Sequence, residues 1–279
     1  MVRTQISPAA LPVLQGKMTT KPRPFQDVVA DLRHIVFAVI RLRPHGDGLL
    51  ARAIGSGFFI GPRLFFTCHH VINGNQDPHR EGDYYQLVNS LGTGGIIHQI
   101  RKAIIGKNVH FFPDRDSALL EIGGQNAYAA VDFREVLPGR DIGVAGYPLP
   151  ELSVNSDGSL GYRGLTFRVA RSVITSIVTT KFTPDGGPTT VPLSAVEVNF
   201  LFVPGNSGGP IFDSQTGRVI GFVHGYQAPR VRERIVTTDL QELPDGVHNQ
   251  YIESIHAIYS VAFAIGCLRD ELEKRGIRP

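Results

Sequence analysis

Short apolar runs separated by turn-forming residues recur along most of this 279-residue chain. The runs have the length and the β-branched and aromatic content of strands, and 31 glycines and 19 prolines supply the breaks between them. A βαβ fold would need helical patterns between successive strands, which this sequence lacks. We therefore predict an all-β fold, with strands near residues 35–43, 53–60, 64–67, 84–89, 95–105, 118–122, 141–146, 166–179, 196–202, 219–226 and 251–265.

Two stretches have the apolar spacing of helices. Residues 25–34 place Val28, Val29 and Leu32 at helical intervals, which predicts a short helix before the first strand. Residues 268–275 place Leu268 and Leu272 on one face and stop before a glycine, which predicts a short C-terminal helix packed on the sheet in front of it.

Residues 205–210, Gly-Asn-Ser-Gly-Gly-Pro, form the most specific motif in the sequence. A serine flanked by glycines, between two apolar strands, lies on a tight turn where a substrate carbonyl can approach the backbone closely. The same geometry leaves the N–H groups of Gly205 and Ser207 available to an oxygen that becomes negative during acyl transfer. The motif predicts a nucleophile at Ser207.

A serine hydroxyl needs a base, and the base needs an acid that orients it. An apolar hairpin over residues 55–67 leads directly into Cys68, His69 and His70, and Asp116 stands at the mouth of the apolar strand near 118–122. The order histidine, aspartate, serine is one of the known chain orders for a catalytic triad.

These motifs resemble the signature blocks of trypsin-like (chymotrypsin-clan) serine peptidases. The blocks are residues 67–71 (Thr-Cys-His-His-Val), 116–120 (Asp-Ser-Ala-Leu-Leu) and 205–210. Residues 55–58 and 261–265 bring the resemblance closer to the bacterial branch of HtrA and glutamyl endopeptidases, over roughly residues 35–275. The likeness implies two six-stranded antiparallel barrels with the active site in the cleft between them, and no cofactor or metal.

By this resemblance His70 is the general base, Asp116 orients it, Ser207 attacks the substrate, and the amides of Gly205 and Ser207 form the oxyanion hole. His69 then has a structural role, because the base is the fourth residue of its block. Asp114 is a rival to Asp116, but the block selects Asp116. A catalytic Cys68 is disfavoured, because it ends an apolar strand where a small buried side chain is the usual role.

Position 206 is aspartate in digestive relatives, where its carboxylate binds the N-terminus created by zymogen cleavage. Here it is Asn206, whose neutral amide cannot form that ion pair. We expect activity without N-terminal trimming.

By family analogy the floor of the primary specificity pocket is Leu201, and a wall follows Val223, His224, Gly225 and Tyr226. Leu201 offers no counter-charge to a buried substrate cation, so the pocket should reject Arg and Lys. We expect an apolar or small P1 side chain, with an acidic one as second choice.

The expected organisation is a flexible leader (1–24), a first barrel with its opening helix (25–130), a second barrel (131–265) and a C-terminal helix (266–279). No PDZ-sized segment follows, unlike in HtrA enzymes. The leader lacks an apolar signal-peptide segment, no run approaches membrane-spanning length, and only Cys68 and Cys267 are present. These features favour the cytoplasm, with export as the alternative.

The net charge of +3 is too small to indicate nucleic-acid binding. The long polar connection over residues 227–249 is a candidate contact for a regulatory protein partner. Two function classes follow: a serine endopeptidase acting on protein or peptide substrates, or a catalytically silent module of the same fold that binds a peptide or protein.

Overall fold

The computed structural model describes residues 21–46, 48–73, 79–89, 96–100, 108–122, 127–148, 151–154, 160–163, 165–182, 191–227, 230–234, 251–255 and 259–279. The predicted leader is therefore outside the described residues except for its last four positions.

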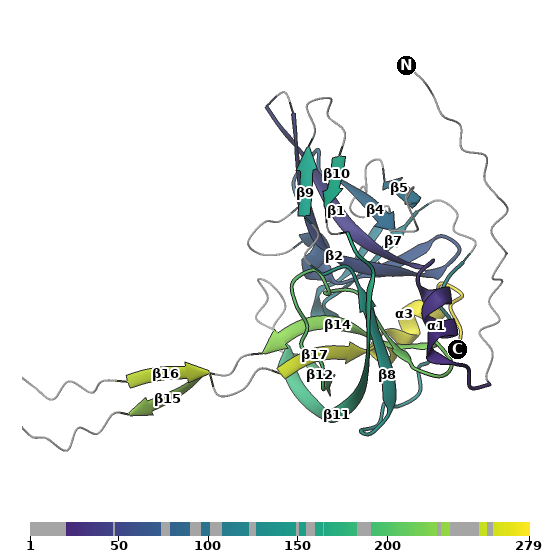
Figure 1. Ribbon diagram of the computed structural model, residues 1–279, viewed down its shortest axis with the longest axis vertical. Helices are drawn as coiled ribbons and strands as arrows, with labels where there is room; N and C mark the ends of the chain where they lie inside the picture. The colour runs from purple at the N-terminus through teal and green to yellow at the C-terminus, as the bar shows by residue number, and fades with distance from the viewer. Residues whose placement is uncertain are drawn as a thin grey trace, which may run out of the picture.

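The N-terminal half is one antiparallel sheet of seven strands in the order β5-β4-β1-β2-β3-β7-β6 (Figure 1). Its strands are β1 (Val36–His45), β2 (Gly48–Gly61), β3 (Leu64–Thr67), β4 (Tyr84–Asn89), β5 (Ile96–Ile100), β6 (Val109–Phe112) and β7 (Ser117–Glu121). A short helix, α2 (His69–Asn73), follows β3, and a 3₁₀ turn, η2 (Pro113–Arg115), joins β6 to β7.

The C-terminal half is a closed antiparallel barrel of six strands. In hydrogen-bonded order these are β11 (Arg168–Phe182), β12 (Val191–Val198), β17 (Tyr259–Ala264), β14 (Val219–Gln227), β13 (Pro210–Asp213) and β8 (Asp141–Gly146). Two separate ribbons pair β9 (Glu151–Val154) with β10 (Leu160–Arg163), and β15 (Arg230–Arg234) with β16 (Tyr251–Ile255).

The all-β prediction is confirmed, including a closed six-stranded barrel in the C-terminal half and a short C-terminal helix; the N-terminal half, predicted to have six strands, has a sheet of seven. The predicted helices are α1 (Phe25–Leu32) and, at the C-terminus, η3 (Ile265–Leu268) followed by α3 (Arg269–Glu273). Of the apolar residues that the sequence spacing singled out, Val28, Leu32, Leu268 and Leu272 are buried, and Val29 is only partly buried. None of the helices in the described part of the chain is long and apolar enough to cross a membrane.

One hydrophobic core joins the two halves. The ring of Phe66 in β3 lies 4.8 Å, centroid to centroid, from that of Phe222 in β14, and Phe222 in turn contacts Phe263 in β17. Edge-to-face contacts of this kind add to the free energy gained from burial. The shared core holds β3 against β14, and it brings His70, just after β3, close to His224 in β14.

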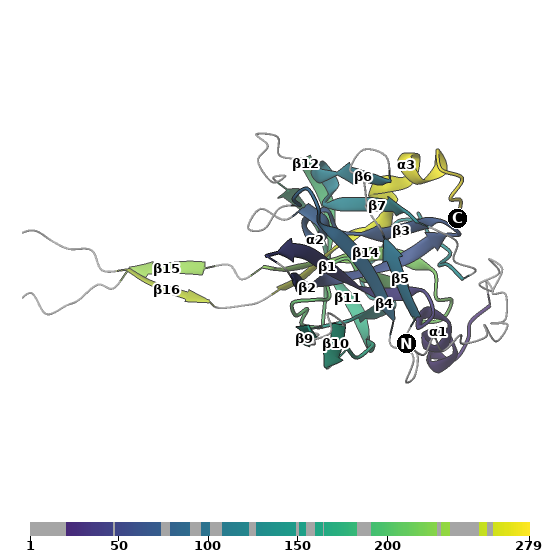
Figure 2. The same ribbon diagram turned by 90° about the horizontal axis from the view of Figure 1, so that it is seen from above.

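The predicted loop over residues 227–249 is partly a β-ribbon. Strands β15 and β16 pair from Arg230↔Ile255 to Arg234↔Tyr251, and both views show this ribbon projecting away from the barrel (Figures 1 and 2). Residues 228–229 and 235–250 of the loop are outside the described residues. A partner at this ribbon stays a prediction.

A largely buried ion pair links β1 to the residue just before β4 in the first sheet. Arg43 on β1 donates two hydrogen bonds of 2.7 Å to Asp83 just before β4, and the Arg80 amide donates a third of 2.9 Å. Burial alone would raise the pKa of Asp83, but the bonds from Arg43 and Arg80 outweigh it and hold this pKa below its usual value.

We expect Asp83→Asn to lower the free energy of unfolding at pH 7 by about 1–3 kcal/mol, since it removes a charge-assisted acceptor. A depressed pKa stabilises the fold above the unfolded value, about 3.9, and this contribution is lost as pH falls through the folded value. The difference in melting temperature from wild type should therefore shrink below about pH 4. A difference that stays constant from pH 7 to pH 3 would contradict this, and Glu81→Gln, an exposed neighbour, is the control.

Candidate active site

His70 and Asp116 meet at the junction of the two halves. His70 lies in the first turn of α2, directly after β3, and Asp116 follows η2 at the start of β7. The Nδ1 atom of His70 is 2.8 Å from Oδ2 of Asp116, and the His70 amide donates to Oδ1 over 3.0 Å. The pairing of β3 with β7 brings these residues together, because Thr67 is opposite Ala118.

The carboxylate of Asp116 is buried, and only 1 % of this residue is exposed. Burial alone would raise the pKa of Asp116, but hydrogen bonds from His224 and His70 outweigh it and hold this pKa well below its usual range. The group is therefore an anion at neutral pH. An anion only accepts hydrogen bonds, so Nδ1 of His70 must carry the hydrogen, which leaves Nε2 as the basic nitrogen.

Asp116 also has an unusual backbone. Its φ of 43° and ψ of 45° are left-handed, and among the described residues it is the one non-glycine residue with positive φ. Aspartate tolerates this region better than most side chains, and such conformations concentrate at functional sites. The His69 amide, which donates to the Asp116 carbonyl over 3.1 Å, helps to hold the conformation.

Ser207 lies on the tight turn before β13 that the glycine motif predicted. Gly205 and Gly208 have φ values of 95° and 83°, which favour glycine at both positions. The Ser56 amide donates to the Ser207 carbonyl over 2.8 Å, and the Ser56 hydroxyl donates to the Gly205 carbonyl over 2.6 Å. The first sheet thus holds the turn from both sides of the serine.

The hydroxyl of Ser207 donates to the backbone carbonyl of His224 over 3.0 Å. The imidazole of the same histidine reaches Asp116, with Nδ1 2.5 Å from Oδ2. Ser207, His70 and Asp116 are thus gathered around His224, and the rings of His70 and His224 are 5.6 Å apart, nearly perpendicular.

The amide N–H groups of Gly205 and Ser207 have no hydrogen-bond acceptor within the described part of the chain. The neighbouring amides are used: Asn206 donates to Val203, and Gly208 donates to Val223. Two unused donors on either side of Asn206 can bind an oxygen that gains negative charge.

Sequence and structure comparisons identify the family and the fold. The trypsin-like peptidase domain matches residues 55–222, which is more than half of the chain. The chain belongs to the trypsin-like peptidase family. No curated protein matches it significantly.

Solved structures of other proteases share the trypsin-like fold. The active form of the Rv3671c protease from M. tuberculosis superposes with a TM-score of 0.56 at 20% identity, covering 93% of this chain and 89% of that one. Its inactive form gives 0.52 at 20% identity, covering 92% and 98%. An HtrA-type protease, AlgW, solved with a tripeptide, gives 0.53 at 14% identity, covering 92% of this chain and 64% of its own. At these identities the likeness describes the fold alone.

Each rival residue of this trypsin-like peptidase has contacts of its own that occupy or bury its side chain. The buried ring of His69 packs edge-on against Phe111 at 4.9 Å. Asp114 is 42 % exposed and pairs with Arg115. Cys68 is buried, its thiol donates to the Val223 carbonyl over 3.2 Å, and burial raises the pKa of this thiol well above its usual value.

Cys68, His70 and Asp116 offer atoms within 4.8 Å of one another that could bind a metal ion. A metal would need the Cys68 thiolate, which burial disfavours, and it would have to displace hydrogen bonds that Asp116 already accepts. The chemistry of these donors fits a hydrogen-bonded cluster better than a metal centre.

The predicted specificity pocket needs correction at two positions. Leu201 is 54 % exposed, so it does not close a pocket as a buried floor. His224 directs its imidazole to Asp116 instead of lining a wall. Val223 is fully buried in the barrel core, Gly225 has open space beside its α-carbon, and the side chain of Tyr226 is outside the described residues.

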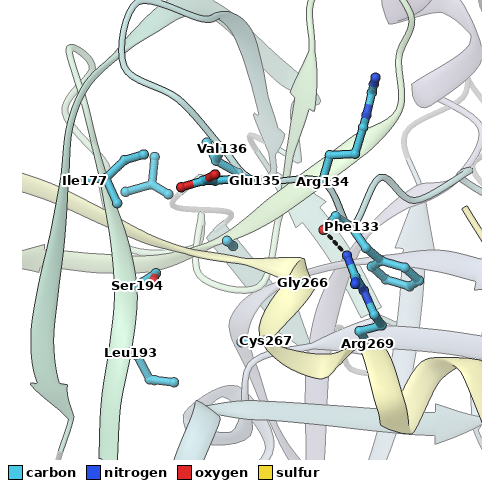
Figure 3. Close-up of a pocket in the computed structure, with 12 residues that line it drawn as sticks. Phe133, Arg134, Glu135, Val136, Ile177, Leu193, Ser194, Gly266, Cys267 and Arg269 are labelled. Carbon is cyan, nitrogen blue, oxygen red and sulfur yellow. Dashed lines mark hydrogen bonds between the residues drawn. The ribbon is translucent and has the colours of Figure 1, made fainter.

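A cavity of about 480 Å³ lies on the C-terminal barrel, and none of the predicted site residues lines it (Figure 3). Arg269 crosses one side of it and donates to the Phe133 carbonyl over 2.6 Å. The lining residues are Phe133, Arg134, Glu135, Val136, Ile177, Leu193, Ser194, Val196, Ala264, Gly266, Cys267 and Arg269.

His224 is the residue that sequence reasoning misplaced. His224 is the extra residue of a β-bulge in β14, because Val223 pairs with Ala262 and Gly225 pairs with Val261 on β17. A bulge interrupts the regular alternation of side chains and re-aims the extra residue, so a period of two could not place His224 from the sequence.

Proposed function

We propose that this chain is a serine endopeptidase in which Ser207 is the nucleophile, His70 the general base and Asp116 the group that orients the base. The observation that carries the proposal is the pair of hydrogen bonds from His70 to the buried Asp116 carboxylate, beside a serine on a glycine turn. Membership of a peptidase family supports peptide bonds as the substrate.

The reaction begins when the Ser207 hydroxyl turns from the His224 carbonyl to Nε2 of His70. Nε2 takes the proton while Oγ bonds to the substrate carbonyl carbon, and the carbonyl oxygen becomes an anion. His70 then gives the proton to the leaving amine as the peptide C–N bond breaks, which leaves an acyl ester on Ser207. Water, activated by the same imidazole, releases the acid and restores the serine.

The amides of Gly205 and Ser207 bind the anionic oxygen in this scheme. Both are held by the contacts of Ser56 with the turn, so they need little rearrangement when the charge develops.

We also propose that the enzyme needs no N-terminal cut. Asn206 is buried and has no carboxylate to receive a new ammonium group. For the substrate we propose an uncharged P1 side chain, because the exposed Phe200 and Leu201 upstream of the turn are apolar. Activity that appears only after trimming, or a peptide-library profile dominated by Arg and Lys, would reject these two points.

An active-site-directed fluorophosphonate tests the whole proposal. We expect it to label the full-length protein, to leave folded Ser207→Ala unlabelled, and to label Ser214→Ala at the wild-type rate. Ser214 is a suitable control because its hydroxyl is buried and has no hydrogen-bond partner in the described structure. Folded wild type that is not labelled at neutral pH would reject the enzyme and favour the partner-binding module.

A further inference from the structure

His224 touches the proposed catalytic machinery through both its ring and its backbone. The ring nitrogen Nδ1 reaches Oδ2 of Asp116, and the carbonyl accepts the hydrogen bond of Ser207. The ring lies tilted on Phe263 at 4.8 Å, and 26 % of the side chain is exposed. The sequence motifs did not predict this contact, and the proposed triad of Ser207, His70 and Asp116 does not include His224.

We propose that His224 is a positioning residue that fixes the Asp116 carboxylate and the Ser207 hydroxyl relative to each other. This inference rests on the proposed serine endopeptidase activity. One residue makes both contacts, so the bond from its ring to Asp116 also helps to fix the backbone carbonyl that accepts the hydrogen bond of the Ser207 hydroxyl.

Nδ1 of His224 must carry a hydrogen, because its partner is the carboxylate of Asp116. The titratable groups that contact the ring are Asp116, just before β7, and His70 in α2. Cys68, which follows β3, lies close to both of these residues. Asp116 is an anion and can only accept, so both imidazoles present Nδ1–H to the same oxygen. A buried carboxylate needs such donors, because an unpaired buried charge is costly.

Because His70 and His224 share one oxygen of Asp116, His224 also affects the position of His70. His70 and His224 both donate to Oδ2 of Asp116, and their ring planes are nearly perpendicular. Removal of the His224 donor would leave Oδ2 bound by His70 alone, and the carboxylate could then rotate and carry the base away from Ser207.

Two substitutions of His224 test whether its N–H donor, and not only the volume of its side chain, is needed. His224→Asn retains an N–H donor near the position of Nδ1, whereas His224→Leu has a similar volume and no donor. We expect the fluorophosphonate labelling rate constant to fall by about 10- to 100-fold in His224→Leu and to stay within about threefold of wild type in His224→Asn. His224→Met repeats the donor-free test if the leucine variant does not fold.

His110→Leu is the matched control. His110 Nε2 is 3.0 Å from Glu121 on the surface of the first sheet, so its loss removes a histidine–carboxylate pair away from the site. We expect wild-type labelling. A folded His224→Leu or His224→Met that labels at the wild-type rate would overturn the proposal, as would an Asn variant as slow as the donor-free variants.

A second readout does not depend on activity. In the proton NMR spectrum of the full chain, the Nδ1–H of His70 should give a protected low-field signal in wild type and His224→Asn, and exchange with water in His224→Leu. A protected signal in His224→Leu would overturn the positioning role even if the wild type were not labelled, and in that case the proposed activity would fail separately.

Discussion

Asp116→Asn should lower the fluorophosphonate labelling rate by about 10,000-fold while the protein stays folded. Asparagine tolerates the left-handed backbone at this position, so the turn before β7 is retained. The loss arises from hydrogen bonding, because asparagine replaces one of two acceptor oxygens with an NH₂ donor.

Both placements of the new amide oppose the surrounding donors. If NH₂ takes the place of Oδ2, it faces Nδ1 of His70 and of His224, and each ring must move its hydrogen to Nε2. His70 can then no longer accept the serine proton. If NH₂ takes the place of Oδ1, it faces the His70 amide. A loss of less than tenfold would contradict the role of Asp116.

The control for this variant is Asp114→Asn. Asp114 is two residues away, 42 % exposed and paired with Arg115, so it shares the charge and the neighbourhood but not the histidines. We expect labelling within about twofold of wild type, since exposed pairs contribute little. The same comparison decides between the two acids that the sequence left as rivals.

Gly208→Ala should destabilise the protein by about 2–5 kcal/mol, from the cost of left-handed backbone together with overpacking. A β-carbon at position 208 would lie 2.3 Å from the Ser56 carbonyl oxygen and 2.4 Å from the Thr67 hydroxyl oxygen, and φ is +83°. The Ser56 oxygen is backbone of β2 and cannot move aside. Thermal unfolding should show a melting temperature lower by roughly 5–15 °C.

Two glycines separate the causes of this loss. Gly139 has a φ of +81° with open space around it, so Gly139→Ala measures the backbone cost alone, about 1–2 kcal/mol. Gly225 has open space and no positive φ, so Gly225→Ala should leave the melting temperature nearly unchanged. If Gly208→Ala matches Gly139→Ala, steric contact with Ser56 is not what fixes the turn.

The fold and the candidate triad followed from local patterns. Short apolar runs with turn residues between them predicted where the strands lie. The sequence blocks around His70, Asp116 and Ser207 predicted the residues of the candidate site. These signals are local, because tight turns and strand ends depend on a few neighbouring side chains.

Other features depend on contacts distant in sequence. Asp116 lies in left-handed backbone after a 3₁₀ turn, whereas the sequence showed only that it precedes an apolar strand. The contact of His224 with Asp116 depends on the register of β14 against the first sheet, which no single segment encodes. Leu201 was placed in a pocket by family analogy, and its exposure depends on how the segment before the serine turn leaves the barrel.

The aromatic contact between β3 and β14 restricts how this enzyme can be recombined. Phe66 belongs to one half of the chain and Phe222 to the other, and their rings pack in a single core. A chimaera that takes one half from a relative must therefore supply rings that pack against those of the other half, or it will leave a cavity between β3 and β14, close to the residues of the candidate active site.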